Sequence, residues 1–499
     1  MAGLEQLLTA PNGGRIPLNT GLFINNQFVK GSSSGKLACL DPATDQTIVE
    51  VEIATAEDVD IAVKAARAAF NDPSWRDMIP EDRAKLMLKL ADLVDQHKEE
   101  LYCLQAWEIG KPYASSMAIE WPLLTACLRY YAGWADKLNG VTIPINSNKF
   151  GYTIKQPVGV CAAIAPWNFP LVNCSWKLGP ALATGCCIIV KPSEYSPLSA
   201  LYLAKLVLKA GYPPGVVQVL NGYGKDTGDA LARHLDVDKI AFTGSTATGK
   251  QIIKSAAINM KKTTIEAGGK SALIVFDDAD LEQAAKWAMA GGMGNAGQIC
   301  SANSRILVQH GAEEKFVKIM TDLIKQSKVG MPFENGTTQG PQASKMQYNK
   351  VLDYMSQAKA EGAKLVVGGG PLEGLGKGYF IQPTIYTGVT SGMKIFQEEV
   401  FGPVLSITSF KTEEEALALA NDSSYGLAGM VFTKNIKTAM RTASRLQTGM
   451  VWINESNHYD VKMPFGGVKE SGLGRELGAT TLEAYLEEKV VHVNLGLEL

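Results

Sequence analysis

The chain has 499 residues, 46% of them hydrophobic and 20% charged, so it is long enough for two or more domains with substantial cores. Its 48 basic and 50 acidic residues give a formal net charge of -2, which argues against binding to nucleic acid or to an anionic membrane surface. Eight cysteines, most of them in apolar stretches, are too few for a disulfide framework and favour reduced thiols in the cytoplasm.

The sequence also argues against three further features: a targeting peptide, a membrane span and a metal site. The N-terminal residues MAGLEQLLTAPNGGRIPLNT lack a basic region followed by an apolar stretch, so we expect no secretory signal or transit peptide. No window holds about 18 uninterrupted apolar residues, which argues against a membrane span. The five histidines are not spaced as metal ligands, so no metal site is predicted.

Residues 56–138 are predicted to be mainly helical. Apolar periodicity indicates helices over 56–70 and 80–110, and another over 116–138 in which Pro122 marks a kink or a late start. Residues 138–157 differ, because they are β-branched, rich in turn residues and alternating in polarity. They indicate a strand excursion or a hairpin that stands away from the main sheet.

Short apolar strands then alternate with helices, which predicts a parallel, doubly wound α/β sheet. The strands are expected over 160–166, 186–193, 216–222 and 239–245, and the helices over 176–185, 196–211, 228–235 and 246–257. Ligands of such sheets bind beyond the carboxyl ends of the strands. Those ends carry Asn168, Lys191, Glu194 and the loop at Gly244.

A second alternating block runs from 271 to about 460 and predicts a second α/β domain. Its expected elements include strands within 271–280, 304–309, 364–370 and 403–410, and an amphipathic helix over 312–329. The tail EEKVVHVNLGLEL predicts a final strand, which could pair with residues 141–155 of this chain or of another subunit.

Cys300 is the one cysteine surrounded by small and polar residues, in GMGNAGQICSANSR. The glycine-rich loop Gly291–Gly297 would let a substrate and backbone N–H groups approach a reactive thiol. A papain-like partner would be a histidine, but no histidine lies in a comparable context. Glu266, at the end of a β-branched run and before two glycines, is the better candidate base. Each alone could equally be structural, as a loop cysteine or a solvated strand-end glutamate.

The segment FTGSTATGK, residues 242–250, joins a predicted strand to a predicted helix. Free N–H groups at that helix N-terminus suit a pyrophosphate, although the pattern is not G-x-G-x-x-G and a plain capped turn is the alternative. Glu194, on the neighbouring strand end, could bind both hydroxyls of an adenine ribose and would repel a 2′-phosphate. This favours NAD over NADP, while Lys191 weakens the preference.

Together these windows resemble the NAD(P)-dependent aldehyde dehydrogenase superfamily, in its hydrolytic, non-CoA-acylating class. Seven motifs occur in family order: APWNFP (165–170), KPSE (191–194), FTGSTATG (242–249), EAGGKS (266–271), GQICSANSR (297–305), EEVFGP (398–403) and PFGGVKESGLGRELG (464–478). The resemblance implies a Rossmann-type NAD-binding domain (1–137 and 158–265), an α/β catalytic domain (266–475) and a small β oligomerisation element (138–157 and 476–499). It also implies a homotetramer or a dimer.

The resemblance assigns roles to individual residues. It implies that Cys300 is the nucleophile, that Glu266 is the general base, and that Asn168 and the Cys300 backbone N–H form the oxyanion hole. The implied cofactor-binding residues are Ile164, Pro166, Trp167, Lys191, Ser193, Glu194, Gly224, Gly228, Phe242, Gly244, Ser245, Gly249, Gly268, Gln347, Lys350, Glu399 and Phe401. The implied substrate tunnel is lined by Phe169, Asn173, Trp176, Gly294, Ser301, Asn457 and Tyr459, with Cys174 as a further neighbour.

The activity implied is oxidation of an aldehyde to a carboxylic acid through a thiohemiacetal and a thioester on Cys300, with water as acyl acceptor. Gly294 and Asn173 stand where simple-aldehyde relatives carry larger apolar side chains, so we expect a wider, more polar tunnel for a bulky or polar aldehyde, aromatic ones included. GQICSA resembles plant betaine-aldehyde enzymes, but Gly294 supplies no ring to a trimethylammonium site. The alternatives are a thiol esterase or other hydrolase using the same cysteine, and a non-catalytic protein of the same fold.

Overall fold

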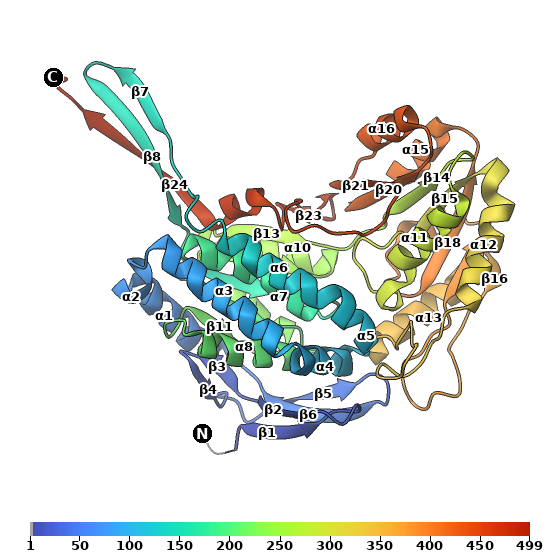
Figure 1. The fold of residues 1–499 in the computed structure, drawn as a ribbon, viewed down its shortest axis with the longest axis horizontal. Coiled ribbons are helices and arrows are strands. Elements are labelled where there is room, and N and C mark those ends of the chain that lie inside the picture. The colour runs from blue at the N-terminus through green and yellow to red at the C-terminus, as the bar shows by residue number, and fades with distance from the viewer. Residues whose placement is uncertain (1–2) are drawn as a thin grey trace.

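The computed structural model describes residues 3–499, which fold around two separate sheets with an arm projecting from one side (Figure 1). The two sheets are each rich in parallel strands, as the alternating pattern predicts. No helix within residues 3–499 is long and apolar enough to cross a membrane.

The first sheet has eight strands in the order β23-β13-β12-β9-β10-β11-β3-β4. Its strands are β3 (Leu22–Ile24), β4 (Gln27–Val29), β9 (Val160–Ile164), β10 (Cys187–Lys191), β11 (Val217–Val219), β12 (Lys239–Thr243), β13 (Lys262–Glu266) and β23 (Gly472–Leu473). The chain winds outward from β9 to β11 and then returns to place β12 on the other side of β9. The carboxyl ends of β9 and β12 therefore border the crevice where such sheets bind ligands.

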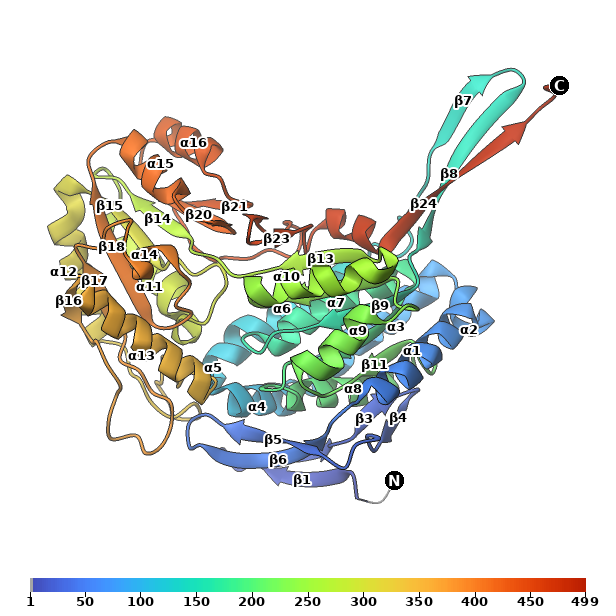
Figure 2. The ribbon, with the colours of Figure 1, turned by 180° about the vertical axis from the view of Figure 1, so that it is seen from behind.

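Helices cover both faces of this sheet. Their bounds are α1 (Ala56–Asn71), α2 (Pro73–Arg76), α3 (Pro80–Gln96), α4 (Lys98–Ile109), α5 (Tyr113–Ser115), η1 (Ser116–Glu120), α6 (Trp121–Ala132), α7 (Pro170–Thr184), α8 (Leu198–Ala210), η2 (Gly224–Gly228), α9 (Asp229–Arg233), α10 (Thr246–Ala256) and η3 (Ala257–Asn259). Figure 2 shows α1, α9 and α10 in front of the sheet, while α3, α6, α7 and α8 lie behind it.

The second sheet has seven strands in the order β16-β17-β18-β15-β14-β20-β21. Its strands are β14 (Ala272–Val275), β15 (Arg305–Gln309), β16 (Lys364–Val367), β17 (Thr384–Thr387), β18 (Val404–Phe410), β20 (Ala428–Phe432) and β21 (Met450–Ile453). Its helices are α11 (Leu281–Met293), η4 (Gly294–Gly297), η5 (His310–Ala312), α12 (Glu313–Lys325), α13 (Lys345–Ala360), α14 (Lys394–Gln397), α15 (Glu413–Asn421) and α16 (Ile436–Arg445). A separate apolar core lies on each face of this sheet.

The arm is a three-stranded antiparallel sheet of β7 (Thr142–Asn146), β8 (Lys149–Pro157) and β24 (Leu486–Asn494). The hairpin predicted over 138–157 does stand away from both main sheets (Figure 1). The C-terminal strand pairs with β8 of its own chain, Leu486 opposite Pro157 and Asn494 opposite Lys149, which settles the open choice of partner. Val141, Ile143, Ile145, Ile154 and Val490 leave apolar side chains exposed on the arm.

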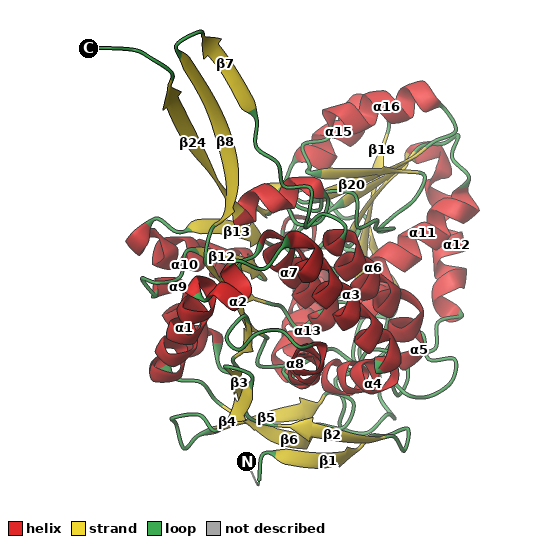
Figure 3. Cartoon of the chain, turned by 60° about the vertical axis from the view of Figure 1, so that its left-hand side comes forward, coloured by secondary structure: helices red, strands yellow, loops and turns green. Residues whose placement is uncertain are grey.

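Several strands lie where the sequence predicted none. Two hairpins, β1 (Glu5–Thr9) with β2 (Arg15–Asn19) and β5 (Lys36–Asp41) with β6 (Gln46–Glu52), lie below α4 and α8 in Figure 3. A short pair joins β19 (Tyr425–Gly426) to β22 (Val468–Lys469). β19 and β22 have only two residues each, and in β5 the exposed Ala38 and Leu40 mask the alternation of the buried Leu37 and Cys39.

Three predicted helices have different bounds. The helix expected over 80–110 is two helices, because His97 ends α3 and precedes α4 without breaking the apolar periodicity. The helix expected over 116–138 begins with the π-helical turn η1, gives way to α6 just before Pro122, and ends before Gly133. The helix expected over 176–185 begins earlier, at Pro170, since every residue of α7 is buried and the helix has no solvent-exposed polar face to mark its start.

Residues of the C-terminal region return to the first sheet. β23 pairs with β13, and Phe465, Leu477, Leu482 and Tyr485 belong to the apolar core of that sheet. The helix η6 (Ala479–Tyr485) then leads into the arm. The stretch from 465 to 486 is therefore built into the domain of the first sheet, although it follows the second sheet in sequence.

Candidate functional site

Glu266 ends β13, where the chain leaves the first sheet and crosses to β14 of the second. Its side chain is buried, and neither carboxylate oxygen has a hydrogen-bond partner among residues 3–499. Burial and the nearby Glu476 raise the pKa of the Glu266 carboxyl well above its usual range. A buried carboxyl without partners is costly, and such groups are typical of catalytic sites.

Cys300 lies directly beside this crossing segment. A Cβ on Gly269 would lie 2.6 Å from the Cys300 carbonyl oxygen, so the two backbones meet at a position that admits only glycine. Burial and the neighbouring Glu266 carboxyl raise the pKa of the Cys300 thiol well above its usual range. The structure thus brings together the thiol and the carboxyl that sequence analysis singled out in two separate motifs.

The segment before Cys300 is only partly a loop, which corrects the prediction for 291–297. Gly291 and Gly292 belong to α11, where they allow close packing: a Cβ on Gly291 would lie 2.2 Å from the Ser456 hydroxyl. Asn295 and Ala296 adopt left-handed backbone, with φ of 49° and 54°. Such conformations are unusual for residues with a Cβ and occur mainly where a site requires them.

Asn168 lies between β9 and α7 and is held from three sides. Its side-chain nitrogen donates to the Gln298 carbonyl oxygen at 3.0 Å, two residues before Cys300. Its own carbonyl oxygen accepts from Lys111 Nζ and from Asn295 Nδ2, both at 3.0 Å. Because the amide has two N–H groups, one remains to serve an oxyanion.

A buried ion pair supports this region and is absent from the sequence prediction. Lys177 on α7 donates to Glu476 at 2.7 Å and to the Thr243 hydroxyl at 2.8 Å. Lys177 lowers the pKa of the Glu266 carboxyl, whereas Glu476 raises it. Two sequence signals could have indicated this ion pair: a lysine inside a mostly apolar helix, and a glutamate within PFGGVKESGLGRELG.

A second buried pair, Lys111 with Glu120, was also missed. The two groups lie 2.5 Å apart, and Lys111 stands 3.6 Å above the centre of the Phe169 ring. Since Lys111 also donates to the Asn168 carbonyl oxygen, this pair fixes the turn that carries Asn168. Nothing in GKPYASSMAIE taken alone indicates that role.

The candidate cofactor residues of the first sheet gather at the carboxyl ends of β9, β10 and β12, as predicted. Ile164 ends β9, and Lys191 ends β10, where it pairs with Glu194 at 3.3 Å. Ser193 accepts from the Tyr195 backbone N–H at 3.3 Å, which shapes the turn. Gly224 and Gly228 bound the neighbouring η2 turn.

The turn from β12 to α10 has an open helix N-terminus. Ser245 caps α10 by accepting from the Thr248 N–H at 3.2 Å, and the first turn contains no acidic residue. The Phe242 ring lies under the turn: a Cβ on Gly244 would lie 2.6 Å from it, and one on Gly249 would lie 2.9 Å from Ile265. These features fit the pyrophosphate of a dinucleotide.

The second sheet contributes the other side of the cleft. Phe401, with φ of 59°, places its ring edge-on to Trp167, with ring centres 5.4 Å apart. Trp167 follows Pro166 at the end of β9, so this contact joins the two domains. Glu399 accepts from the Gly269 N–H at 2.9 Å, and a Cβ on Gly268 would collide with its carboxylate.

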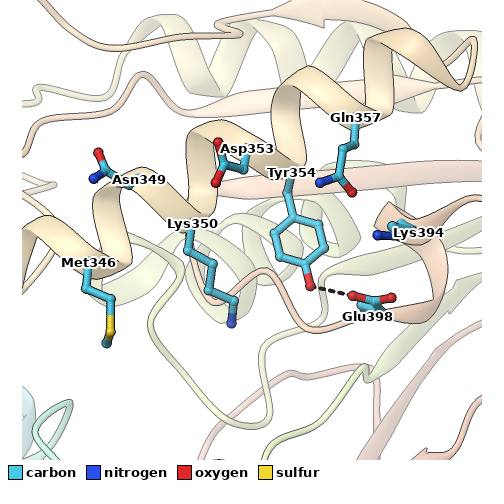
Figure 4. Close-up of a pocket in the computed structure, with 8 residues that line it drawn as sticks. All are labelled: Met346, Asn349, Lys350, Asp353, Tyr354, Gln357, Lys394 and Glu398. Atoms are coloured by element: carbon cyan, nitrogen blue, oxygen red, sulfur yellow. Dashed lines mark hydrogen bonds between the residues drawn. The ribbon is translucent and has the colours of Figure 1, made fainter.

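Gln347 and Lys350, the less specific of the cofactor matches, both lie on α13. Gln347 donates to the carbonyl oxygens of Val400 and Phe401 at 3.0 and 2.8 Å, so it supports the Glu399–Phe401 segment. Lys350 lines an open cavity of about 360 Å³ along α13. Figure 4 shows this cavity, with Tyr354 donating to Glu398 at 2.6 Å.

The candidate tunnel residues come from both domains. Phe169, Asn173 and Trp176 lie at or near the start of α7, and Gly294 follows α11. On the other side, Ser301, Asn457 and Tyr459 form a hydrogen-bonded cluster. Phe465 lies between the two groups, with ring centres 4.9 Å from Trp176 and 5.6 Å from Tyr459.

We call the space between Phe169, Asn173 and Trp176 on one side and the cluster of Ser301, Asn457 and Tyr459 on the other the chamber. Cys174 does not approach this chamber, contrary to the sequence interpretation. It packs with Leu178, Val190 and Leu203 between α7, β10 and α8. The reason is helical geometry: residue 174 lies about a quarter turn from Asn173, which moves its side chain toward the sheet.

Comparisons with known proteins show which family the chain is similar to. The model of the Aldehyde dehydrogenase family matches residues 28–491. An aldehyde dehydrogenase of Emericella nidulans is 49% identical over 477 residues, 95% of each chain. Retinal dehydrogenase 2 of Mus musculus is 46% identical over 498 residues, 99% of this chain and 95% of that one.

Solved structures give the same result. The NAD+ complex of an aldehyde dehydrogenase from Bacillus cereus has a TM-score of 0.94 and 46% identity, covering 96% of this chain and 97% of that one. Betaine aldehyde dehydrogenase from Staphylococcus aureus in complex with NAD+ has a TM-score of 0.95 and 41% identity, covering 97% and 96%.

The chain belongs to the aldehyde dehydrogenase family. The predicted family, its α/β fold and the activity class, an NAD(P)-dependent aldehyde dehydrogenase, are confirmed. NAD as the cofactor agrees with the NAD+ complexes of these relatives.

Proposed function

We propose that this aldehyde dehydrogenase oxidises an aldehyde to a carboxylic acid through a thioester on Cys300, which water hydrolyses with Glu266 as base. The observation that carries this proposal is the unpartnered, buried Glu266 carboxyl beside the Cys300 thiol. A panel of aldehydes assayed with NAD+ and with NADP+, read as reduced-cofactor absorbance, tests it. Formation of NADH and acid in equal amounts is expected.

Each of the three groups has a separate role. Cys300 loses its proton and adds through Sγ to the aldehyde carbon, and the free N–H of Asn168 stabilises the oxyanion. When bound, NAD+ supplies the two-electron acceptor for the oxidation. Glu266 then takes a proton from water, whose oxygen attacks the thioester carbon. The C–S bond breaks, the carboxylic acid leaves, and the Cys300 thiolate takes the proton back from Glu266.

The same cysteine and oxyanion donor would also support ester hydrolysis, which needs no redox step. An enzyme that hydrolysed esters while forming no NADH from any aldehyde would make hydrolysis its main activity. If neither reaction occurred, the chain would be a non-catalytic protein of this fold.

Glu194 is the residue proposed to favour NAD over NADP. Its carboxylate lies on the turn after β10 beside Lys191, where it would accept from ribose hydroxyls and repel a 2′-phosphate. Glu194→Gln is expected to lower the ratio of kcat/KM with NAD+ to kcat/KM with NADP+ by about tenfold. The exposed Glu81→Gln serves as control. An unchanged ratio would remove Glu194 from cofactor selection.

Gly294 is proposed to widen the aldehyde tunnel. A Cβ on this residue would meet only the Ile299 side chain, at 3.3 Å, so space remains there for substrate. Gly294→Phe is expected to lower kcat/KM for bulky aromatic aldehydes at least tenfold relative to acetaldehyde, because the ring occupies that space. An improvement with bulky aldehydes would contradict the proposed wide tunnel.

We further propose a homotetramer, built from dimers, that works in the cytoplasm. The exposed apolar side chains on β7, β8 and β24 support assembly through the arm, which comprises 138–157 and part of 476–499. Residues 1–137 with 158–265 are proposed to bind NAD, and 266–475 to carry Cys300. A nucleophilic thiol must stay reduced, which supports a reducing compartment. Light scattering on purified protein would give the oligomeric state.

A further inference from the structure

Asn173 carries a buried carbonyl oxygen that no group of residues 3–499 satisfies. The residue is 5% exposed, and its Oδ1 has no hydrogen-bond partner within that range. Its Nδ2 donates to the Phe169 carbonyl oxygen at 3.1 Å, which fixes the orientation of the amide. Because buried polar atoms nearly always have partners, an unpartnered acceptor at this place requires an explanation.

Asn173 lies on the face of α7 that borders the candidate site. Phe169, Trp176 and Lys177 lie four residues before, three after and four after Asn173, so all share one helix face. Trp176 contacts Phe465, and Lys177 reaches Glu476 beside Glu266. The face of α7 that carries Asn173 therefore borders the chamber of the candidate site.

The opposite side of the chamber also presents acceptors. The Tyr459 hydroxyl donates to Asn457 Oδ1 at 2.7 Å, and the Ser301 hydroxyl donates to the same oxygen at 2.5 Å. The Asn457 amide is oriented by its nitrogen, which faces the carbonyl oxygens of Gly291 and Ser301 at 3.4 Å. Both hydroxyl hydrogens are thus used within the cluster, and only oxygen lone pairs remain for a substrate.

We propose that the substrate is an uncharged aldehyde bearing a hydroxyl group, which donates its hydrogen to Asn173 Oδ1. The inference rests on the proposed function, since it concerns the same chamber. A neutral donor fits better than an ammonium group, because Phe169, Asn173, Trp176, Ser301, Asn457 and Tyr459 offer no charge to balance a cation. The rings of Trp176, Phe465 and Tyr459 would pack against the carbon skeleton of the aldehyde.

Matched aldehyde pairs test this proposal. Each pair has the same skeleton with and without a hydroxyl: 3- and 4-hydroxybenzaldehyde against benzaldehyde, and ω-hydroxyalkanals of increasing length against the alkanals. For at least one pair, the wild-type enzyme is expected to show a kcat/KM at least tenfold higher for the hydroxylated member. Asn173→Leu, which keeps the branched shape of the side chain but removes the acceptor, is expected to abolish that preference.

The aldehyde without a hydroxyl is an internal reference, because the preference is the ratio of kcat/KM for the two members of a pair in the same variant, so a general change in the activity of Asn173→Leu cancels. Asn259→Leu is a matched control: Asn259 Oδ1 is also buried without a partner among residues 3–499, while its Nδ2 donates to Leu235 and Val237, away from the chamber. Asn173→Ala, which also removes the acceptor, provides a second variant if the leucine variant does not fold.

The outcomes separate the two proposals. If no aldehyde is oxidised with NAD+, the proposed function fails. If aldehydes are oxidised but no pair shows a preference, or if the preference survives in Asn173→Leu and Asn173→Ala, the role of Asn173 is overturned. A larger preference for amino-substituted than for hydroxylated aldehydes would overturn the choice of a neutral donor.

Discussion

Cys300→Ala is expected to abolish NADH formation with every aldehyde while leaving NAD+ binding intact. The thiol is the only proposed group that forms a bond to the substrate, and an alanine methyl cannot add to a carbonyl. The cofactor residues lie on other elements, at the ends of β9, β10 and β12 and on the Glu399–Phe401 segment. Steady-state rates over the aldehyde panel, with calorimetric titration of NAD+, would measure both effects.

Cys174→Ala is the matched control, because this cysteine lies in the core between α7, β10 and α8, packed among Leu178, Val190 and Leu203. Its removal costs core packing, so a lower Tm with retained turnover is expected. Aldehyde oxidation that persisted in Cys300→Ala would remove Cys300 as the nucleophile and with it the covalent mechanism.

Glu266→Gln is expected to slow turnover by about 10²–10⁴-fold, because the amide cannot accept a proton from water. Acylation does not require the deacylation base, so an initial burst of NADH, equal to the number of active sites, should precede the slow phase. Stopped-flow absorbance would resolve the burst. Glu50→Gln, on the exposed side of β6, is the control and should behave as wild type. Steady turnover at the wild-type rate, with no initial burst, would refute the assignment of Glu266 as the deacylation base.

The pH dependence follows from the same two groups. Burial raises the pKa of both Glu266 and Cys300, so each is held in its protonated form over a range where it would ordinarily ionise. Both must lose a proton to act, and the rate is therefore expected to increase as pH rises from neutral to alkaline. In Glu266→Gln only the thiol remains to titrate, so the rising limb should become less steep. A flat profile in the wild type would contradict this assignment.

Much of the site could be predicted because its residues stand in short segments with local chemical meaning. Strands β9, β10 and β12 are short apolar runs, and the residues after each parallel strand must lie at one edge of the sheet. The sequence alone therefore places Asn168, Lys191, Glu194 and Gly244 at that edge. The glycines near Glu266 and Cys300 likewise marked places where backbone must approach closely.

Other features depend on contacts between distant residues. The pair of Lys177 with Glu476 joins positions on α7 and after β23, and no local pattern indicates it. The same holds for Lys111 and Glu120, which fix the Asn168 turn, and for the chamber cluster of Ser301 with Asn457 and Tyr459. The observed helix bounds differ from the predicted ones in two situations. Apolar periodicity continues through a break at His97, and α7 is buried on all sides.

Periodic patterns were enough to indicate the two alternating α/β blocks and the projecting hairpin, and seven short motifs were enough to indicate the family and the candidate thiol and carboxyl. The packed fold was needed to show that the C-terminal strand pairs with β8 of its own chain, that Cys174 faces the core, and that the buried Asn173 Oδ1 has no hydrogen-bond partner among residues 3–499. Those outcomes depend on which groups satisfy one another across the fold, because hydrogen-bond partners and burial are properties of the packed molecule rather than of any segment.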